Sequence, residues 1–426
     1  MEVYQIPDRI ASQIAHVVFF SAHAYLREPI GFDKIHTKEN GKSNRNADLN
    51  YMTPRRRFLK ITAAGAAAGG ALAAGWYAFL HSARFGRLPQ GKRRERILLS
   101  PNYRNGAFRN LPSAYRPPFR PDDGRGGVWS ALFRKRALRL VPKEGDIATV
   151  KSDLLNLDRT RDLFVWFGHS SYLLQTDGAR ILVDPVFGTA SPVSFLLGEP
   201  FPGTSIYAPN DIPEIDVLVI THDHWDHLDY STVTALRNRI GRIVCPLGVG
   251  EHFELWGFDP EMLIELDWGE ATELPCADGR NIAFHCLPTL HFSGRGFVRN
   301  QSLWASFLVE APSRKVYFGG DGGYDERFKR IGARFPNIDL AFLENGQYNL
   351  RWPRVHTLPD ELAKAMLHLG ARRYITGHHG KFCISTHPWD EPYANEKAAA
   401  AVAGANLIVP RIGEIVPLAE STTRYE

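Results

Sequence analysis

The sequence predicts a mixed α/β fold, because short apolar runs typical of strands alternate with amphipathic segments typical of helices. The 426 residues include 37 glycines and 28 prolines, a loop-rich composition that disfavours a helical bundle. Hydrophobic residues make up 44% of the chain, which is enough for a large buried core. We therefore expect one large α/β domain with accessory segments.

The main domain is expected over residues 161–420, where the pattern of strands and helices is clearest. The predicted strands are Leu163–Phe167, Tyr172–Gln175, Arg180–Val183, Ile215–Ile220, Ile282–Leu287, Leu303–Glu310 and Lys315–Phe318. The run Ile215–Ile220 is almost wholly apolar, which is typical of a strand buried on both faces of a sheet. Helical periodicity predicts helices at Tyr230–Asn238 and Pro359–Leu369.

The four cysteines show no spacing typical of a zinc knuckle. Residues 278–279 (Asp-Gly) predict a two-residue hairpin turn, which would pair Cys276 with Asn281 and Cys286 with Ala271. On this register the two thiols do not face each other. We therefore expect unpaired, buried cysteines.

The amino-terminal part carries the pattern of an export signal. Residues 53–60 read Thr-Pro-Arg-Arg-Arg-Phe-Leu-Lys, and the Ala- and Gly-rich stretch Ile61–Leu80 follows without a charge. Paired arginines before Phe-Leu-Lys and an apolar stretch are typical of the twin-arginine signal, which we place over residues 52–85. The chain is thus expected in the periplasm. The alternative is a retained inner-membrane anchor facing the periplasm, since about 20 apolar residues span a bilayer.

This signal lies unusually far from the first residue. Met52 directly precedes it, so we expect translation to begin there and residues 1–51 to be an artefact of gene prediction. The alternative is a genuine extension with an amphipathic helix over Ile10–Tyr25.

A basic, Pro/Gly-rich arm is expected over residues 86–160, wrapped over the main domain. The net charge of +5 is mild for this length and shows no footprint of a nucleic-acid binder. Basic residues are nevertheless dense between Arg84 and Lys143. The favoured interpretation is a solvated surface, and the alternative is contact with anionic lipid headgroups.

The chemistry is concentrated directly after the buried strand, where residues 221–229 read Thr-His-Asp-His-Trp-Asp-His-Leu-Asp. As the chain leaves a strand, His222 and His224 can point to one side, and a tight turn brings Asp226 and His227 next to them. Imidazole and carboxylate ligands suit zinc, or manganese or iron. We therefore predict a metal site here.

One cluster cannot complete two metal shells, so further ligands are expected at the ends of later strands. His291 follows the predicted strand Ile282–Leu287. Asp321 lies between paired glycines, which allow the backbone to approach a metal closely. His378 ends an apolar run at Ile375-Thr376-Gly377, and His379 is its neighbour.

The ordered set His-x-His-x-Asp-His, a lone His, Gly-Asp and a last His resembles the metallo-β-lactamase superfamily. Further stretches resemble its branch of N-acylphosphatidylethanolamine-hydrolysing phospholipase D and sugar-phosphate lactonases. These are Trp166–Ser171, Asp184–Val186, Ala190–Pro192, Phe318–Tyr324 and Tyr348–Trp352. The resemblance covers roughly Leu163–Pro410. It implies an αββα sandwich of two packed mixed sheets flanked by helices.

The resemblance also implies the ligands of two divalent cations, most simply zinc. One cation is held by His222, His224 and His291, and the other by Asp226, His227 and His378, with Asp321 bridging both. Two cations about 3.5–4 Å apart would share a hydroxide that attacks the substrate. Asp226 and Asp321 are the residues expected to hold the geometry and charge balance of catalysis.

The last motif departs from the phospholipase pattern, which has His-Trp-Gly-Thr-Phe where this chain has His378-His379-Gly380-Lys381-Phe382. Alignment on the Gly and the Phe favours His378 over His379 as the ligand. Substrate contacts are predicted for Lys381, His379, Tyr348 and His356. His356 is also a candidate for supporting a ligand, and His169 and Asp184 are predicted to have structural roles.

The favoured function is a phosphodiesterase acting on a phospholipid or another small molecule. The alternative on the same fold is a lactonase or another hydrolase of C–O or C–N rings. A non-catalytic metal-binding protein would show eroded ligands, whereas all seven positions are filled here.

Overall fold

The computed structural model describes residues 65, 68–71, 73–113, 139–192, 198–276, 279–350 and 352–418. The chain divides into two units, residues 1–74 and 75–426. The described residues of the first unit are helical. The predicted start at Met52, the twin-arginine motif at 53–60 and the extension before them lie outside the described residues. Within the described ranges, no helix is both long and apolar enough to cross a membrane.

The second unit is built on two mixed sheets. The first sheet has the order β15-β3-β4-β5-β6-β7-β8. Its strands are β3 (Leu163–Trp166), β4 (Tyr172–Thr176), β5 (Ala179–Val183), β6 (Ile215–Val219), β7 (Ile240–Pro246), β8 (Leu263–Leu266) and β15 (Ile415–Pro417). The second sheet has the order β14-β13-β12-β11-β10-β9. Its strands are β9 (Ala271–Pro275), β10 (Asn281–Leu287), β11 (Ser306–Glu310), β12 (Lys315–Phe318), β13 (Leu340–Glu344) and β14 (Tyr374–Gly377).

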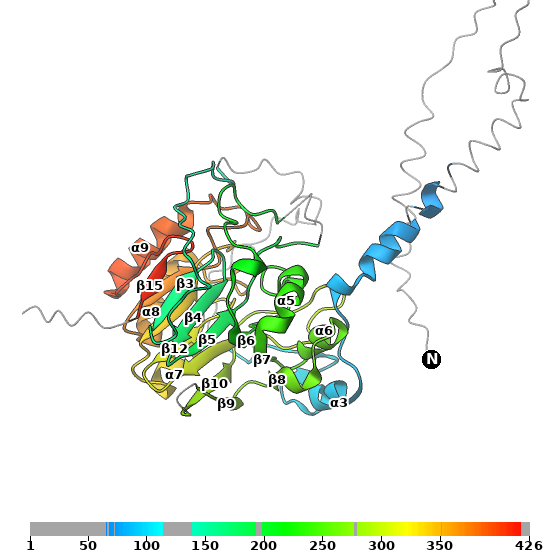
Figure 1. The fold of residues 1–426 in the computed structure, drawn as a ribbon, viewed down its shortest axis with the longest axis horizontal. Helices are drawn as coiled ribbons and strands as arrows, with labels where there is room; N and C mark the ends of the chain where they lie inside the picture. The colour runs from blue at the N-terminus through cyan, green and yellow to red at the C-terminus, as the bar shows by residue number, and fades with distance from the viewer. Residues whose placement is uncertain are drawn as a thin grey trace, which may run out of the picture. The chain divides into compact units, whose positions relative to one another are not determined.

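The sheets enclose one apolar core, to which Phe164, Ile181, Phe284, Phe318 and Phe342 contribute. A second core lies between the first sheet and the helices α5 (Tyr230–Leu236) and α6 (Gly250–Leu255). A third lies between the second sheet and α7 (Arg327–Arg334), α8 (Pro359–Leu369) and α9 (Glu391–Ala403). Figure 1 shows α5 and α6 on one side of the strands and α8 and α9 on the other. The architecture is therefore the predicted αββα sandwich.

The bounds of β12 and α8 match the prediction, but the strand expected from Leu303 begins only at Ser306. Leu303 and Ala305 instead donate backbone hydrogen bonds to Leu247 and Thr221, outside the ladder. The sequence analysis did not predict β7, β8, β13, β15, α6, α7 or α9, whereas β9 was implied by the predicted hairpin.

The four cysteines, all within the described residues, form no disulfide; Cys245, Cys276 and Cys286 are buried, and Cys383 is partly exposed. The predicted hairpin register is wrong by one residue, because Asn281 pairs with Pro275 and His285 with Ala271. The Cys276 amide donates to the Arg280 carbonyl, so the turn contains three residues and not two.

The described part of the predicted arm begins with α3 (Gly91–Leu99) and a two-stranded ribbon, β1 (Tyr103–Arg104) and β2 (Ala107–Phe108). The Arg93 guanidinium lies within 2.7 Å of three carboxylates of the main domain, Glu251, Glu254 and Glu265. This charge is therefore neutralised by the protein itself. Residues 114–138, which contain six of the basic residues of the arm, lie outside the described ranges.

Both sheets direct the ends of several strands to one edge. In the first sheet β3, β5 and β6 run parallel to one another. In the second sheet β10, β12, β13 and β14 do so. The loops that follow these strands therefore meet, and they carry every ligand predicted from the sequence.

Candidate metal centre

The loop after β6 presents the His-x-His-x-Asp-His cluster. The amides of His227 and Leu228 donate to the His224 carbonyl, which closes a tight turn. Asp229 then caps α5 by accepting from the Ser231 and Thr232 amides. This turn brings the side chains of the His-x-His-x-Asp-His cluster close to one another.

The first ligand group consists of His222, His224 and His291. Nδ1 of His224 lies 2.9 Å from Nε2 of His222 and 3.2 Å from Nε2 of His291. Burial lowers the pKa of His222 and His291 well below the ordinary value, and that of His224 to about 4. The group therefore consists of neutral imidazoles at neutral pH.

The tautomers of His222 and His291 follow from the hydrogen bonds of the ring nitrogen that faces away from the ligand group. Nδ1 of His291 donates to the Val355 carbonyl at 2.9 Å. The Thr221 hydroxyl donates to Asp184 and is left to accept from Nδ1 of His222 at 3.0 Å. The Nε2 lone pairs of both histidines then face Nδ1 of His224, which can donate to only one of them. A cation between the three nitrogens resolves this conflict.

The second ligand group consists of Asp226, His227 and His378. Oδ2 of Asp226 lies 3.2 Å from Nε2 of His378 and 3.6 Å from Nε2 of His227. Although burial raises the pKa of Asp226, the neighbouring His227, His169 and His378 hold it well below its ordinary value. The carboxylate is thus ionised among imidazoles.

Asp321, which follows β12, joins the two groups. Oδ1 lies 3.2 Å from Nε2 of His227, and Oδ2 lies 3.0 Å from Nε2 of His378. Oδ2 is also 3.9 Å from Nε2 of His222 and 3.8 Å from Nε2 of His291. Asp321 is therefore placed to reach a cation in either group.

The donor set passes a test for bound cations. Nε2 of His227 and Oδ1 of Asp321 are buried and make no hydrogen bond to any described residue. Buried polar atoms without partners are costly in a folded protein, and metal ligation satisfies them. The structure brings all seven predicted ligands together, and their atoms form groups compact enough to hold a metal ion.

Asp184, at the end of β5, supports the second group. Its carboxylate accepts from the amide and hydroxyl of Thr221, and from Nδ1 of His227 at 2.8 Å. This fixes the proton of His227 on Nδ1 and leaves Nε2 free for a cation. The placement agrees with the structural role predicted for Asp184.

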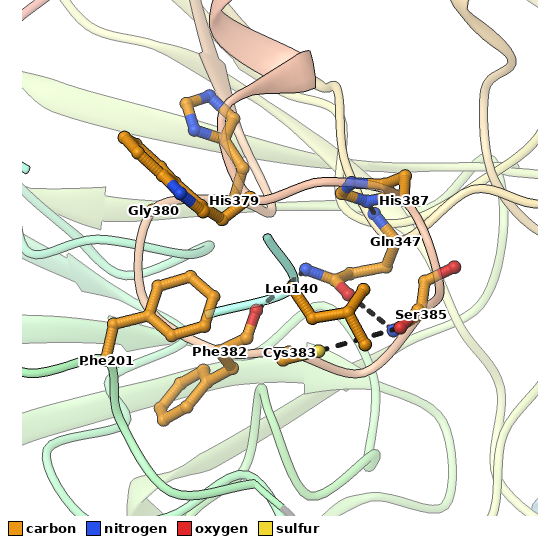
Figure 2. Close-up of a pocket in the computed structure, with 10 residues that line it drawn as sticks. Leu140, Phe201, Gln347, His379, Gly380, Phe382, Cys383, Ser385 and His387 are labelled. Carbon is orange, nitrogen blue, oxygen red and sulfur yellow. Dashed lines mark hydrogen bonds between the residues drawn. The ribbon is translucent and has the colours of Figure 1, made fainter. Parts of the chain in front are cut away.

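Two supporting residues were missed in the sequence. Glu344 ends β13, accepts from the Gly322 amide at 2.7 Å, and lies 3.3 Å from Nδ1 of His378. Gln347 holds the loop after β14, donating to the carbonyls of His378 and Phe382 and accepting from the Ile384 and Ser385 amides. Figure 2 shows its hydrogen bonds to Phe382 and Ser385. An acidic residue closing an apolar run was the available signal for Glu344, and Gln347 offered none.

His356 lies beside the centre but is engaged by the protein. Its Nδ1 pairs with Glu344, and its ring stacks on His378 with the centroids 5.0 Å apart. It thus supports a ligand, which was one of its two predicted roles.

The other substrate contacts predicted from the sequence are directed away from the ligands. The Lys381 ammonium is buried and donates to the Val186 and Phe167 carbonyls. The Tyr348 hydroxyl donates to Glu391 of α9. His379 lies in the wall of a small pocket that Phe201 and Phe382 also line (Figure 2), and its ring contacts Trp166 and Tyr393.

These placements correct the prediction for Lys381, His379 and Tyr348. His378 has a left-handed backbone (φ +63°), so its neighbour His379 turns to the opposite side. Sequence proximity to His378 therefore did not place these side chains at the cations.

A buried set of imidazoles and carboxylates, at the strand ends of an αββα sandwich, defines a metal-dependent hydrolase. The family model described as a beta-lactamase superfamily domain matches residues 179–379. The chain belongs to the metallo-β-lactamase superfamily.

Three relatives illustrate the range of similarity. An uncharacterized protein of Mycobacterium tuberculosis is 37% identical over 74% of this chain and 84% of its own length. The N-acyl-phosphatidylethanolamine-hydrolyzing phospholipase D 1 of Caenorhabditis elegans is 34% identical over 52% of this chain and 64% of its own. A metal-dependent hydrolase of Pyrobaculum aerophilum is 27% identical over 59% of this chain and 97% of its own.

Proposed function

We propose that this chain hydrolyses a phosphodiester bond of a phospholipid and uses two divalent cations to do so. The observation that carries the proposal is the meeting of six ligand side chains, in two groups of three, around a seventh, the buried Asp321. Five imidazole nitrogens and two carboxylates suit Zn²⁺, with Mn²⁺ or Fe²⁺ as alternatives. A non-catalytic role does not explain why the full set is present.

The protein's own groups have separate tasks in this proposal. When bound, two divalent cations would lower the pKa of a water nucleophile and stabilise the negative charge that develops on the substrate. His222, His224 and His291 hold one cation, and Asp226, His227 and His378 the other. Asp321 contributes to both and balances their charge. Asp184 keeps the proton of His227 on the nitrogen that faces away from the cations.

Substrate approach is expected from the side of His224 and Asp226, because the other five ligands are buried. Trp225 lies between these two residues and is half-buried, and the Phe292 ring packs against His224 with the centroids 4.4 Å apart. Further along the same loop Phe297 is 77% exposed. An apolar rim beside the ligands supports a substrate with acyl chains. The Caenorhabditis elegans relative, named for its action on N-acyl-phosphatidylethanolamine, supports the same class of substrate.

We also propose that the chain is exported by the twin-arginine route and works in the periplasm or anchored to the inner membrane. The support is the sequence of residues 53–80 and the suitability of this route for folded metalloproteins. Fractionation of cells that express the wild type and an Arg55→Lys/Arg56→Lys variant tests this. Export would be contradicted if the wild type were absent from the periplasmic and membrane fractions and the variant were distributed among the fractions in the same way.

The activity is tested by assaying purified, metal-loaded protein on N-acylphosphatidylethanolamine vesicles, on a soluble phosphodiester and on lactones. We expect phosphodiester hydrolysis that disappears in His222→Ala. His285→Ala is the matched control, because His285 lies on β10, contacts Glu310 and Phe335, and belongs to neither ligand group. Hydrolysis of lactones alone would replace the proposal by the ring-hydrolase alternative.

A further inference from the structure

We propose that His169 is a positioning residue of the metal centre. Its imidazole donates from Nε2 to Asp226 and holds this carboxylate toward the second cation without binding the cation itself. The inference rests on the metal centre of the proposed function and is independent of the substrate.

His169 follows β3 and is fully buried against the second ligand group. Its Nε2 lies 2.9 Å from Oδ2 of Asp226, the oxygen that also faces His378. Its ring packs against the ring of His378 with the centroids 4.2 Å apart. These distances suit a hydrogen bond to Asp226 and equally a place among the ligands of the cation.

The two roles are distinguished by the hydrogen-bond partner of the second ring nitrogen, the one that does not face the ligand group. A metal-binding histidine donates its second ring nitrogen to an oxygen acceptor, which fixes the tautomer and raises the basicity of the ligating nitrogen. The second nitrogen has such a partner in four of the predicted ligands. These pairs are His222 with the Thr221 hydroxyl, His227 with Asp184, His291 with the Val355 carbonyl, and His378 with the Gly346 carbonyl.

His169 departs from this pattern. Its Nδ1 is buried and makes no hydrogen bond to any described residue. A proton on Nδ1 would therefore be a buried donor without an acceptor, which is strongly unfavourable. The proton belongs on Nε2, where Asp226 accepts it, and a protonated Nε2 cannot bind a cation.

The backbone fixes the ring in this place. The His169 amide donates to the His379 carbonyl at 2.8 Å, and the His378 amide donates to the His169 carbonyl at 3.0 Å. Nε1 of Trp166 donates to the same carbonyl at 2.9 Å. His169 and His378 are both left-handed, at φ +53° and +63°, a conformation that non-glycine residues keep only where their surroundings impose it. The loop after β3, which carries His169, is therefore joined directly to the loop after β14, which carries His378.

Two substitutions separate the donor from the ring. His169→Gln places an amide donor near the position of Nε2, whereas His169→Leu removes the donor. Both impose the same backbone strain, so their difference reports the hydrogen bond. Titration of the metal-free proteins with Co²⁺ gives the affinity of each site, and the visible absorption at saturation reports the number of ligands.

We expect His169→Leu to weaken one of the two Co²⁺ sites about 10- to 100-fold and to leave the other unchanged. His169→Gln should recover most of this loss, and the saturated spectra of all three proteins should agree. An unchanged affinity in His169→Leu, failure of His169→Gln to recover it, or a saturated spectrum of His169→Leu that lacks a nitrogen ligand would each overturn the inference.

If neither variant folds, ¹⁵N spectra of the histidine rings in the Zn²⁺-loaded wild type decide the question. A proton on Nε2 of His169 supports the inference, and a metal on that nitrogen contradicts it. Neither measurement depends on hydrolysis, so a failure of the proposed phosphodiesterase activity would be recognised separately.

Discussion

Burial of Lys381 is expected to make the stability of the fold depend on pH. The side chain is 2% exposed, and its ammonium donates only to the Val186 carbonyl at 2.8 Å and the Phe167 carbonyl at 3.4 Å. Burial lowers its pKa from 10.5 to about 7, against a smaller opposing effect of Asp229. Between these two values the unfolded chain binds a proton that the folded chain does not. The free energy of unfolding therefore rises with pH across this window.

The magnitude follows from the two pKa values. A shift of about 3.5 units corresponds to about 5 kcal/mol in total, because each unit is worth about 1.4 kcal/mol. About 3 kcal/mol of this is recovered between pH 6 and pH 9. Lys381→Met removes the titrating group while keeping a side chain of similar length.

Urea unfolding of the metal-free wild type and of Lys381→Met at pH 6 and pH 9 tests this. The difference in stability between the two proteins should change by about 3 kcal/mol between these pH values. Lys92→Met, at an exposed position on α3, is the matched control and should show no such change. If the difference in stability between the wild type and Lys381→Met were the same at pH 6 and pH 9, the burial argument would be refuted. If, in addition, the KM of Lys381→Met were higher than that of the wild type, Lys381 would again be a candidate substrate contact.

Three further predictions concern the metal centre and the arm. Asp184→Asn should weaken one cation site about 10- to 100-fold in a calorimetric titration, because it disturbs the acceptor of His227, and an unchanged affinity would contradict this role. Although burial opposes it, Asp321 and Asp226 raise the pKa of His227 to about 10, and the same two carboxylates raise the pKa of His378 well above its ordinary value. The cation of the second group must therefore displace two protons. Its affinity should rise about 100-fold per pH unit from pH 6 to 8. The first group, with His224 at a pKa of about 4, should bind independently of pH there, and equal pH dependence of both sites would contradict the assignment. Arg93→Ala removes the ion-pair partner of the largely buried Glu265 and one of the two partners of Glu251, which keeps Arg87, and should cost about 3 kcal/mol in urea unfolding. Arg96→Ala, at an exposed ion pair with Glu270, should cost less than about 1 kcal/mol, and equal losses would contradict the difference in burial.

The sequence predicted the fold and the ligands for a physical reason. Alternating apolar runs encode the strands, and metal ligands lie where strands end, so His291, Asp321 and His378 were found by their position after such runs. The His-x-His-x-Asp-His cluster is contained in one turn and needs no tertiary information.

Other features depend on tertiary contacts that no local pattern encodes. Glu344 and Gln347 support His378 from a different loop. The end of an apolar run could have marked Glu344 as a candidate, but nothing in the sequence places either residue beside His378. Lys381 was predicted to contact the substrate from its place in the motif that begins at His378, whereas the structure buries its side chain inside the protein, beyond the left-handed residues His378 and Gly380. The predicted hairpin register was wrong because the turn has one residue more than expected, which shifts every residue pair of the hairpin by one.

The most direct test of the two-cation centre is the metal content of the purified chain after dialysis against Zn²⁺. Elemental analysis of the wild type should give two metal ions per chain, and His285→Ala should match it. Asp321→Ala should give fewer than two, because Asp321 is placed to reach both cations. One metal ion or none in the folded wild type would contradict the account.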